Sequence, residues 1–378
     1  MIRYKFLLFR PVRFYSIQYS KPLDILFFGS DEFSIHSFKA LQSLSLQKPK
    51  LISNLQLVTR PPKWCGRKKS ILRKPPILEY IERHTSNQLH PILCDTRQEM
   101  LDLLMPHLSL STNSMLIAVS YGKLIPQELI QYANYSINVH PSLLPRYKGS
   151  APIQHTLLNN DPVTGVSIQT LDPCKFDNGE IIARTPEINV QQLLDNDTTT
   201  MERTPGYMTR IMIDQLGNIG ASLLSDVITS QTYKNHEPLP EVYGSSWATT
   251  IKTRDKQVDW IKYTADYIAR MIAVLGPVFT FKSIQLGKVH RSTDSFMNKR
   301  VLLHQVEPIK WPSQDLKPGQ FQFDPVTNVI RVGCAANTQL EITRLQFEAC
   351  AIESSDEFMR RLKKRCGPKA ADITTFIN

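Results

Sequence analysis

Short apolar runs alternate with segments of helical periodicity through the first 230 residues of the chain. Runs this short and continuous are typical of strands buried on both faces of a parallel sheet. The predicted strands are residues 23–28, 55–59, 91–93, 115–119, 137–140, 166–171 and 181–188, and the predicted helices are residues 33–44, 77–83, 97–105, 127–132, 152–159 and 207–229. This alternation predicts an α/β domain built on a doubly wound, mostly parallel sheet of the Rossmann-like type.

The hydrophobic period shifts towards two beyond residues 231–246, a proline-containing stretch that we interpret as a linker. The predicted strands here are residues 301–306, 319–323, 329–332 and 340–342, with one helix before them at residues 263–274. Short strands separated by turn residues favour a small, open β-barrel. We therefore predict two domains, residues 22–230 and residues 247–378, with the barrel in the second.

Composition is that of an ordinary globular protein. The chain has 378 residues, 42% of them hydrophobic, which is enough for two cores. No apolar run approaches the roughly 20 residues that cross a bilayer. The six cysteines are scattered without a C-x-x-C pair, which favours free thiols over a disulfide framework or a zinc site. We expect neither a membrane partner nor a metal ion.

The N-terminal stretch, residues 1–21, is rich in basic and apolar residues and contains no acidic one. Its cations include Arg3, Lys5, Arg10 and Arg13. This composition is typical of an amphipathic mitochondrial presequence, and the alternative is a plain basic arm. We prefer import, expect the protein in the mitochondrial matrix, and leave the stretch out of the fold.

The net charge of +11 is divided unevenly along the chain. Residues 1–90 hold 16 Lys or Arg and 5 Asp or Glu, residues 91–244 hold 9 and 16, and residues 245–378 hold 20 and 13. Basic ends around an acidic middle favour a polyanionic partner, such as a nucleic acid, held by the flanks of the molecule. A basic presequence together with a solvated basic surface would produce the same net charge, so the charge alone does not establish a nucleic-acid partner.

Polar residues collect where the strand at residues 137–140 ends. Asn138 and His140 are two apart, so their side chains point to the same face, and prolines follow at once. Asp177 lies on a turn after the next strand. An amide, an imidazole and a carboxylate together could stabilise an oxyanion and move a proton. The alternatives are an asparagine that only turns the backbone and a histidine that is only packed.

The motif around these residues resembles the folate-dependent formyltransferases. It consists of Asn138-Val139-His140, the run Ser-Leu-Leu-Pro-Arg-Tyr-Lys-Gly at residues 142–149, and Asp177-Asn178-Gly179. The Ser-Ala-Pro-Ile run that follows is most similar to methionyl-tRNA formyltransferases rather than to the glycinamide ribonucleotide enzymes, and the predicted presequence suits the mitochondrial type. The resemblance implies transfer of a formyl group from 10-formyltetrahydrofolate to the α-amino group of methionyl-initiator tRNA, for mitochondrial translation initiation.

The same resemblance implies which residues form the site. Asn138, His140 and Asp177 are then catalytic. The folate is expected against Tyr121, Gly122, Ser142, Leu143, Leu144 and Pro145. The second turn is one residue longer than the family pattern and also contains Asp172, but Asp177 is preferred because the residues after it continue that pattern. A nucleophilic Ser142 is disfavoured, because no Gly-x-Ser-x-Gly elbow surrounds it.

Residues 60–76 hold seven basic residues and no acidic one. This charge excludes burial and predicts a surface loop, which by default is only solvated. In the resembled family, a basic loop at this place enters the tRNA acceptor stem. The implied tRNA contacts are Lys63, Arg67, Lys68, Lys69, Arg73 and Lys74. Arg67 falls where the family has its key arginine, although the family's Asp-Arg-Pro lead-in is absent. Trp64 could stack on an unpaired base.

The basic cluster at residues 360–365 is either a second tRNA contact or a solvated helix face. Two other functions also stay open. A transformylase acting on a small amine such as glycinamide ribonucleotide would not need a second, basic domain. A non-catalytic RNA-binding protein would not need Asn138, His140 and Asp177 together. We expect a monomer.

Overall fold

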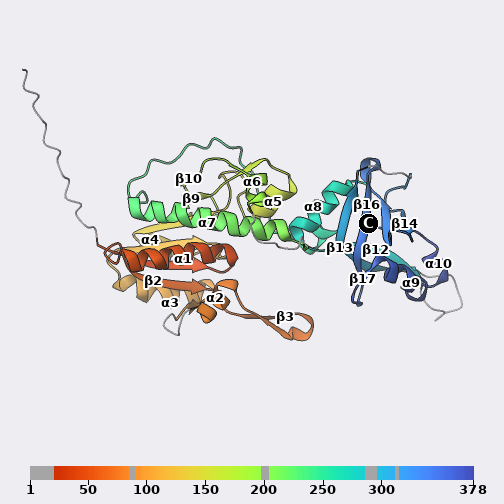
Figure 1. The fold of residues 1–378 in the computed structure, drawn as a ribbon. Helices are drawn as coiled ribbons and strands as arrows, with labels where there is room; N and C mark the ends of the chain where they lie inside the picture. The colour runs from red at the N-terminus through yellow and green to blue at the C-terminus, as the bar shows by residue number, and fades with distance from the viewer. Residues whose placement is uncertain (1–20, 85–89, 197–203, 286–295, 311–314) are drawn as a thin grey trace, which may run out of the picture.

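The structure is a computed structural model that describes residues 21–84, 90–196, 204–285, 296–310 and 315–378. An α/β unit and a β-rich unit lie side by side, and α7 (Tyr207–Ser230) and α8 (Ala265–Leu275) meet between them (Figure 1). The predicted presequence, residues 1–21, lies outside the described residues except for Lys21. No helix in the described part of the chain is long and apolar enough to cross a membrane.

A seven-stranded sheet forms the centre of the first unit. Its strands are β1 (Leu23–Gly29), β2 (Ile52–Thr59), β5 (Ile92–Leu93), β6 (Ser114–Val119), β7 (Tyr135–His140), β9 (Ser167–Thr170) and β10 (Ile181–Arg184). They lie in the order β10-β9-β7-β6-β1-β2-β5, and the five strands from β7 to β5 are parallel. Strand β9 runs antiparallel to both of its neighbours. This arrangement confirms the predicted doubly wound, mostly parallel sheet.

Helices cover both faces of this sheet because its strands are apolar on both faces. They are α1 (Glu32–Gln47), α2 (Pro76–His84), α3 (Arg97–Leu110), α4 (Gln127–Tyr132), α5 (Pro152–Leu158), α6 (Val190–Asp195) and α7. On β1, Leu23, Ile25 and Phe27 belong to the core under α1 and α7. Leu26 and Phe28 point the other way, into the core under α3 and α4.

Helix α3 is longer than the prediction, which ended it at residue 105. The helix continues through Pro106, although a proline removes one backbone hydrogen bond from a helix. Leu104 and Leu108, on either side of the proline, are both buried against the sheet. Their burial compensates for the missing hydrogen bond, so the helix continues past the proline to Leu110.

The strand predicted at residues 181–188 is also corrected, because Pro186 divides it. Strand β10 ends before the proline, and β11 (Ile188–Asn189) pairs with β8 (Val163–Thr164) in a separate two-stranded sheet. A proline cannot donate to the ladder, so it separates the two strands. The residues that follow, for which the sequence analysis predicted no element, form α6.

The second unit is an antiparallel sheet of six strands. They are β12 (Val278–Gln285), β13 (Phe296–Ile309), β14 (Phe321–Asp324), β15 (Val329–Gly333), β16 (Gln339–Phe347) and β17 (Ile352–Ser354). The order is β12-β13-β16-β15-β14, with β17 beside β16. The prediction missed β12 and β17 but placed the other four. Helix α9 (Ser355–Cys366) packs on this sheet and buries Phe358 and Leu362 in its core.

The segment after α10 (Pro368–Ala371) closes this sheet into a barrel. The two edges of the sheet are β12 and β14. Ile377 exchanges two backbone hydrogen bonds with Phe281 of β12, at 3.0 and 2.9 Å. Thr374 accepts a third, of 2.8 Å, from the N–H of Phe321 in β14. The segment therefore bridges both edges, which agrees with the predicted small barrel.

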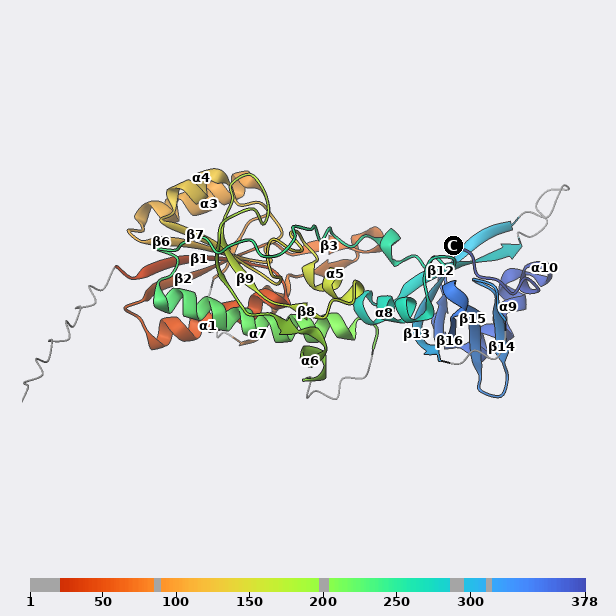
Figure 2. The same ribbon diagram turned by 90° about the horizontal axis from the view of Figure 1, so that it is seen from above.

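Residues 231–246 lead from the first unit to the second as turns and extended chain (Figure 2). They follow the surface of the α/β unit, where the Leu239 N–H donates to the Ile181 carbonyl (2.8 Å). The two units also touch directly, because the Thr209 hydroxyl of α7 donates to the Val274 carbonyl of α8 (2.8 Å). The stretch predicted as a linker is therefore attached to the first unit along its course.

Candidate functional site

The carboxyl ends of β1 and β6 lie side by side where the strand order of the sheet reverses. Just beyond them, the Ser30 hydroxyl donates to the Tyr121 carbonyl (3.2 Å). Open α/β sheets bind ligands in the crevice at such a point. A cavity of about 660 Å³ lies here, and its lining includes Asp31, Asn138, His140 and Asp177.

The three predicted catalytic residues meet in this cavity. Asn138 Nδ2 donates to Asp177 Oδ1 (3.1 Å), and His140 Nδ1 lies 3.4 Å from the same oxygen. The side chains of His140 and Asp177 are 6% and 9% exposed. Strand β7 carries Asn138 and His140 on one face, and the turn after β9 delivers Asp177 to them. The structure thus brings together what the sequence placed on two separate segments.

The imidazole of His140 lies between two acceptors, the Tyr147 carbonyl and the Asp177 carboxylate. His140 Nε2 lies 2.9 Å from the Tyr147 carbonyl, which can only accept, so Nε2 carries hydrogen. Nδ1 then faces Asp177 Oδ1, the oxygen that also accepts from Asn138. The other carboxylate oxygen of Asp177 accepts from the Gly149 N–H (2.8 Å). The ring and the carboxylate are therefore placed so that a proton can pass between them.

The turn that carries Asp177 depends on its neighbours. Asp177 has a left-handed backbone (φ 51°), which is uncommon outside glycine and concentrates at functional sites. A Cβ at Gly179 would lie 1.8 Å from the Thr170 carbonyl, so only glycine fits there. Asp172 serves the turn itself, because its Oδ1 accepts from the N–H groups of Cys174 and Lys175 (2.7 and 2.8 Å). These bonds lower the pKa of Asp172.

Sequence reasoning missed two buried polar residues on β9. Gln169 pairs with Asn138, and Ser167 with His140, along the β7–β9 ladder. Gln169 Nε2 donates to Asp177 Oδ1 (2.9 Å), and the Ser167 hydroxyl donates to the Ser142 carbonyl (2.8 Å). A glutamine within a strand predicted to be buried on both faces was a usable signal, since buried amides need partners.

The six predicted folate contacts divide into two groups. Tyr121 and Gly122 line the cavity, which fits the prediction. The lining includes Pro141 and Gly149 but not Ser142, Leu143, Leu144 or Pro145. Contact of these four residues with the folate stays a prediction. The Ser142 hydroxyl donates to the Arg146 carbonyl (2.6 Å), while Leu143 and Leu144 are buried. They shape the loop that carries the partner of His140.

Tyr121 contributes to the cavity with only part of its side chain. Its hydroxyl points into the core and donates to the Cys94 carbonyl (2.7 Å), and its ring packs edge-on against Phe28. Burial raises the pKa of Tyr121, so the hydroxyl stays protonated. Tyr121 is therefore a fixed wall of the cavity and not an acid or base.

Asp31 is a titrating group of the cavity that the sequence did not reveal as one. Its Oδ1 caps α1 by accepting from the Ser34 N–H (3.0 Å). Burial raises the pKa of Asp31 to about 7, against this bond. Carboxyl groups with such a shift occur preferentially at functional sites. Only the packed structure shows the burial, so the sequence carried no signal for it.

The residues just after the stretch predicted as a linker form one wall of the cavity. Trp247 lines it and makes a parallel bridge with Lys148. One residue earlier, the Ser246 hydroxyl accepts from the Tyr147 N–H (2.9 Å), and the Tyr147 carbonyl in turn binds His140. The segment that enters the second unit is thus two bonds away from the imidazole. Sequence reasoning missed this contact because it treated these residues as a spacer.

The basic loop is a β-hairpin that projects from the first unit towards the second (Figures 1 and 2). We call β3 (Lys63–Cys65), β4 (Ile71–Arg73) and the turn between them the basic hairpin. Lys68 and Lys69 at its tip are exposed and, with Arg73, form no ion pair with any residue that the structure describes. Trp64 is 60% exposed. The segment predicted as a surface loop is thus an exposed hairpin.

Two of the predicted tRNA contacts already have acidic partners. Lys74 Nζ is 2.7 Å from Glu82, and Lys63 Nζ is 2.7 Å from Asp95 at the root of the hairpin. Arg60 also binds Asp95 (2.9 Å). Although partial burial acts in the opposite direction, the hydrogen bonds from these two cations lower the pKa of Asp95 to about 2. The root is thus anchored by ion pairs, and the tip is left to the solvent.

Most cations of the cluster at residues 360–365 are committed within the second unit. Arg361 and Arg365 both bind Glu353, whose side chain is 1% exposed. Arg360 pairs with Asp356 one helical turn earlier (2.6 Å). These contacts favour a structural role for the arginines of α9 over a second nucleic-acid contact.

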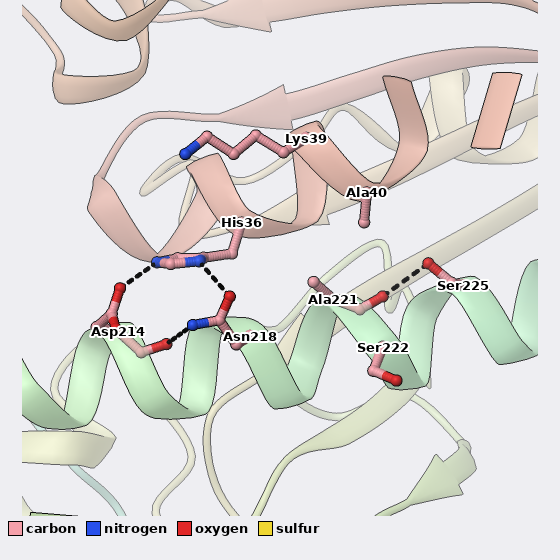
Figure 3. Close-up of a pocket in the computed structure, with 8 residues that line it drawn as sticks. All are labelled: His36, Lys39, Ala40, Asp214, Asn218, Ala221, Ser222 and Ser225. Atoms are coloured by element: carbon pink, nitrogen blue, oxygen red, sulfur yellow. Dashed lines mark hydrogen bonds and ion pairs between the residues drawn. The ribbon is translucent and has the colours of Figure 1, made fainter. Parts of the chain in front are cut away.

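A second hollow, of about 610 Å³, lies between α1 and α7 and contains none of the residues above (Figure 3). His36 of α1 points at α7, where its ring nitrogens lie 3.3 Å from Asp214 and 3.0 Å from Asn218. A Cβ at Gly217 would lie 2.4 Å from the His36 ring. The polar groups here bind one another, so this hollow records how the two helices pack.

Comparison with known proteins finds matches for both units of the chain. Residues 23–216 match the Formyl transferase family, and residues 250–363 match the Formyl transferase C-terminal domain. The mitochondrial methionyl-tRNA formyltransferase of Saccharomyces cerevisiae is 41% identical over 92% of this chain and 91% of its own length. The human mitochondrial methionyl-tRNA formyltransferase is 26% identical over 83% of this chain and 72% of its own length.

A solved structure shows the same fold at much lower identity. The crystal structure of WlaRD, a sugar 3N-formyltransferase in the presence of dTDP and 5-N-formyl-THF, superposes with a TM-score of 0.50 at 15% identity. The superposition covers 88% of this chain and all of WlaRD. At this identity the likeness concerns the fold alone.

Proposed function

The chain belongs to the formyl transferase family and, within it, to the mitochondrial methionyl-tRNA formyltransferases, and we propose that Asn138, His140 and Asp177 carry its reaction. The reaction transfers a formyl group from 10-formyltetrahydrofolate to the α-amino group of methionyl-initiator tRNA for translation initiation. One observation supports the three residues above all. The Asn138 amide and the His140 imidazole converge on one carboxylate oxygen, Asp177 Oδ1, inside the cavity at the strand ends.

Attack by the amine places charge on the formyl oxygen. An α-amino group titrates near neutral pH, so a reactive neutral fraction is present without a strong base. A bond forms between the amine nitrogen and the formyl carbon, and the carbonyl oxygen becomes an oxyanion. Asn138 Nδ2 has a second hydrogen besides the one given to Asp177, and it can donate to that oxygen. In other enzymes the loss of one such donor costs about 3 kcal/mol of barrier.

His140 and Asp177 manage the proton. The amine nitrogen must lose a proton as it attacks, and the departing N10 of the folate must gain one as the carbon–nitrogen bond breaks. The protonated His140 stabilises the oxyanion and can supply the proton to N10. The Asp177 carboxylate accepts the proton of the amine. A proton then passes from Asp177 to His140 across their 3.4 Å contact, which returns both residues to their starting states.

The cavity also has the character that a folate needs. Its wall beyond Tyr121 and Gly122 is built from Leu124, Ile125 and Leu171, which suit a flat ring system. We place the folate on this side, with Tyr121 and Gly122 as contacts, and the amine on the side of the residues after Ser246. The structure describes no cluster of three or more metal-ligating side chains among residues 21–378 outside its gaps.

The tRNA is proposed to lie across the basic hairpin and the second unit. Lys68, Lys69 and Arg73 offer cations to phosphates. Trp64 stands beside them and offers a surface for stacking on an unpaired base. Lys63 and Lys74 would contribute less because each already pairs with a carboxylate. Arg67 completes the proposed set of contacts.

We also propose the setting in which the enzyme works. It is mitochondrial, and the acid-free residues 1–21 suit import into the matrix, where initiator tRNA is used. Residues 22–230 would form the catalytic domain, residues 231–246 the linker, and residues 247–378 the tRNA-binding domain of a monomer.

An assay with three acceptors tests the function. The protein is given 10-formyltetrahydrofolate and, separately, methionyl-initiator tRNA, free methionine and glycinamide ribonucleotide, and formylated product is measured. We expect product only with the tRNA. Product with glycinamide ribonucleotide alone would replace the proposal with a transformylase of small amines. Tight tRNA binding without any product would leave an RNA-binding protein.

A further inference from the structure

Gln169 is a group of the catalytic cavity that the mechanism above does not use. It lies on β9 directly opposite Asn138, lines the cavity and is 2% exposed. An amide buried to this extent is costly unless it is bonded. Packing alone does not explain a glutamine here, because an apolar side chain of the same length would fill the space without the cost of burying an amide.

The amide of Gln169 is directed at one atom. Its Nε2 donates to Asp177 Oδ1 at 2.9 Å, the oxygen that also faces His140 and Asn138. We propose that Gln169 is a positioning residue that holds the Asp177 carboxylate ionised and in place while Asn138 turns its amide to the formyl oxygen. This inference rests on the function proposed above.

The need for such a holder follows from the work that Asn138 has to do. Asp177 has a left-handed backbone, and the Gly149 N–H holds only one of its carboxylate oxygens, Oδ2. Asn138 donates to it at 3.1 Å in the resting state, but the same amide has to follow the oxygen of the substrate during the reaction. The Gln169 bond is shorter and comes from a side chain with no other task, so it persists when Asn138 moves.

Two substitutions of similar side-chain length test this role. In Gln169→Met the donor is lost, so protonation of the Asp177 carboxylate becomes easier. We expect kcat to fall on the order of tenfold to a hundredfold, as for loss of a hydrogen bond to a charged group, and the acid limb of the pH–rate profile to move up by about one pH unit. In Gln169→Glu a second carboxylate faces Asp177, so activity near neutral pH should fall further.

Other groups could influence the same limb and have to be named. His140 lies on β7, Asp172 and Lys175 on the turn before Asp177, Lys148 on the facing loop, and Asp31 after β1. All of them are present in wild type and in both variants, so only the change at Gln169 separates the profiles. The KM for methionyl-tRNA should stay within about twofold, because the residue is remote from the basic hairpin.

The matched control is Gln56→Met, on β2 of the same sheet, where the amide donates to the His90 carbonyl (2.7 Å). It should leave the profile unchanged. Equal activity of Gln169→Met and wild type, or a Gln169→Glu variant as active as the Met variant near neutral pH, would overturn the inference. Thermal unfolding shows whether the Met variant is folded. If it is not, the activity of the Glu variant near neutral pH tests the inference alone, and a value equal to that of wild type overturns it. Inactivity of the wild type with methionyl-tRNA would instead refute the proposed function.

Discussion

The catalytic cavity and the basic hairpin are built in opposite ways. In the cavity, Asp177 accepts three N–H bonds, and both ring nitrogens of His140 have partners. On the hairpin, the strands are three residues long, Lys68 and Lys69 extend into solvent, and Trp64 is largely exposed. One region is fully determined by its contacts, and the other is determined only at its root.

The contrast follows from what each region has to do. Chemistry requires donors that are already in place, because any rearrangement during the reaction adds to the barrier. Attraction to phosphates depends on charge and counterion release, which tolerate mobile side chains. A change in the cavity should therefore act on the rate, and a change on the hairpin should act on affinity and its dependence on salt.

The largest expected effect is that of removing the imidazole. His140→Ala loses the proton donor and the cation beside the oxyanion, so kcat should fall roughly 10² to 10⁴-fold. The Kd for methionyl-tRNA should change by less than about twofold. Single-turnover formylation and equilibrium tRNA binding measure the two quantities. His107→Ala on α3 serves as the control. A variant that keeps its single-turnover rate but loses tRNA would assign His140 to binding.

A smaller effect is expected from the tip of the hairpin. The double variant Lys68→Ala, Lys69→Ala should weaken tRNA binding about tenfold, with little effect on the rate at saturating tRNA. The plot of log K against log salt should lose between one and two units of slope, since each neutralised phosphate contributes about 0.9. Binding titrations at several salt concentrations give the slope. Lys48→Ala, at the end of α1, controls for net charge, and an unaltered slope in the double variant would contradict the proposed contact.

The smallest effect on catalysis is expected at Asp31, where a substitution acts on stability. The pKa of Asp31 is raised from 3.8 unfolded to about 7 folded, so its favourable contribution is present below pH 3.8 and is lost as pH rises through 7. Asp31→Asn keeps an acceptor for the α1 cap but does not titrate. Relative to wild type, the free energy of unfolding of the variant should rise by up to about 4 kcal/mol between pH 4 and pH 8, because each pKa unit corresponds to about 1.4 kcal/mol. Chemical denaturation across this range measures the difference, which a constant value would contradict.

What could be predicted from the sequence was local. The apolar run at residues 23–28 gave β1, and the spacing of Asn138 and His140 placed both on one face of β7. Failures were also local where two signals conflicted. Pro106 indicated a helix end, yet buried leucines on both sides carried α3 past it.

The rest of the site depends on which strands become neighbours. Gln169 faces Asn138 only because β9 pairs with β7, and no pattern within β9 reports that pairing. Ser246 reaches the Tyr147 N–H only because the chain returns along the first unit before it enters the second. Burial of Asp31 likewise depends on elements far apart in the sequence. Periodicity contains none of this information.

The bridge from Ile377 to β12 has a consequence for how the enzyme is made. A nascent chain emerges with its N-terminus first, so β12 exists long before the segment that will occupy its outer edge. During synthesis, and again during unfolding and refolding, that edge is an unpaired row of N–H and C=O groups open to other chains. Contacts so distant along the chain also form late. We expect the second unit to be the part of the enzyme that most needs a chaperone.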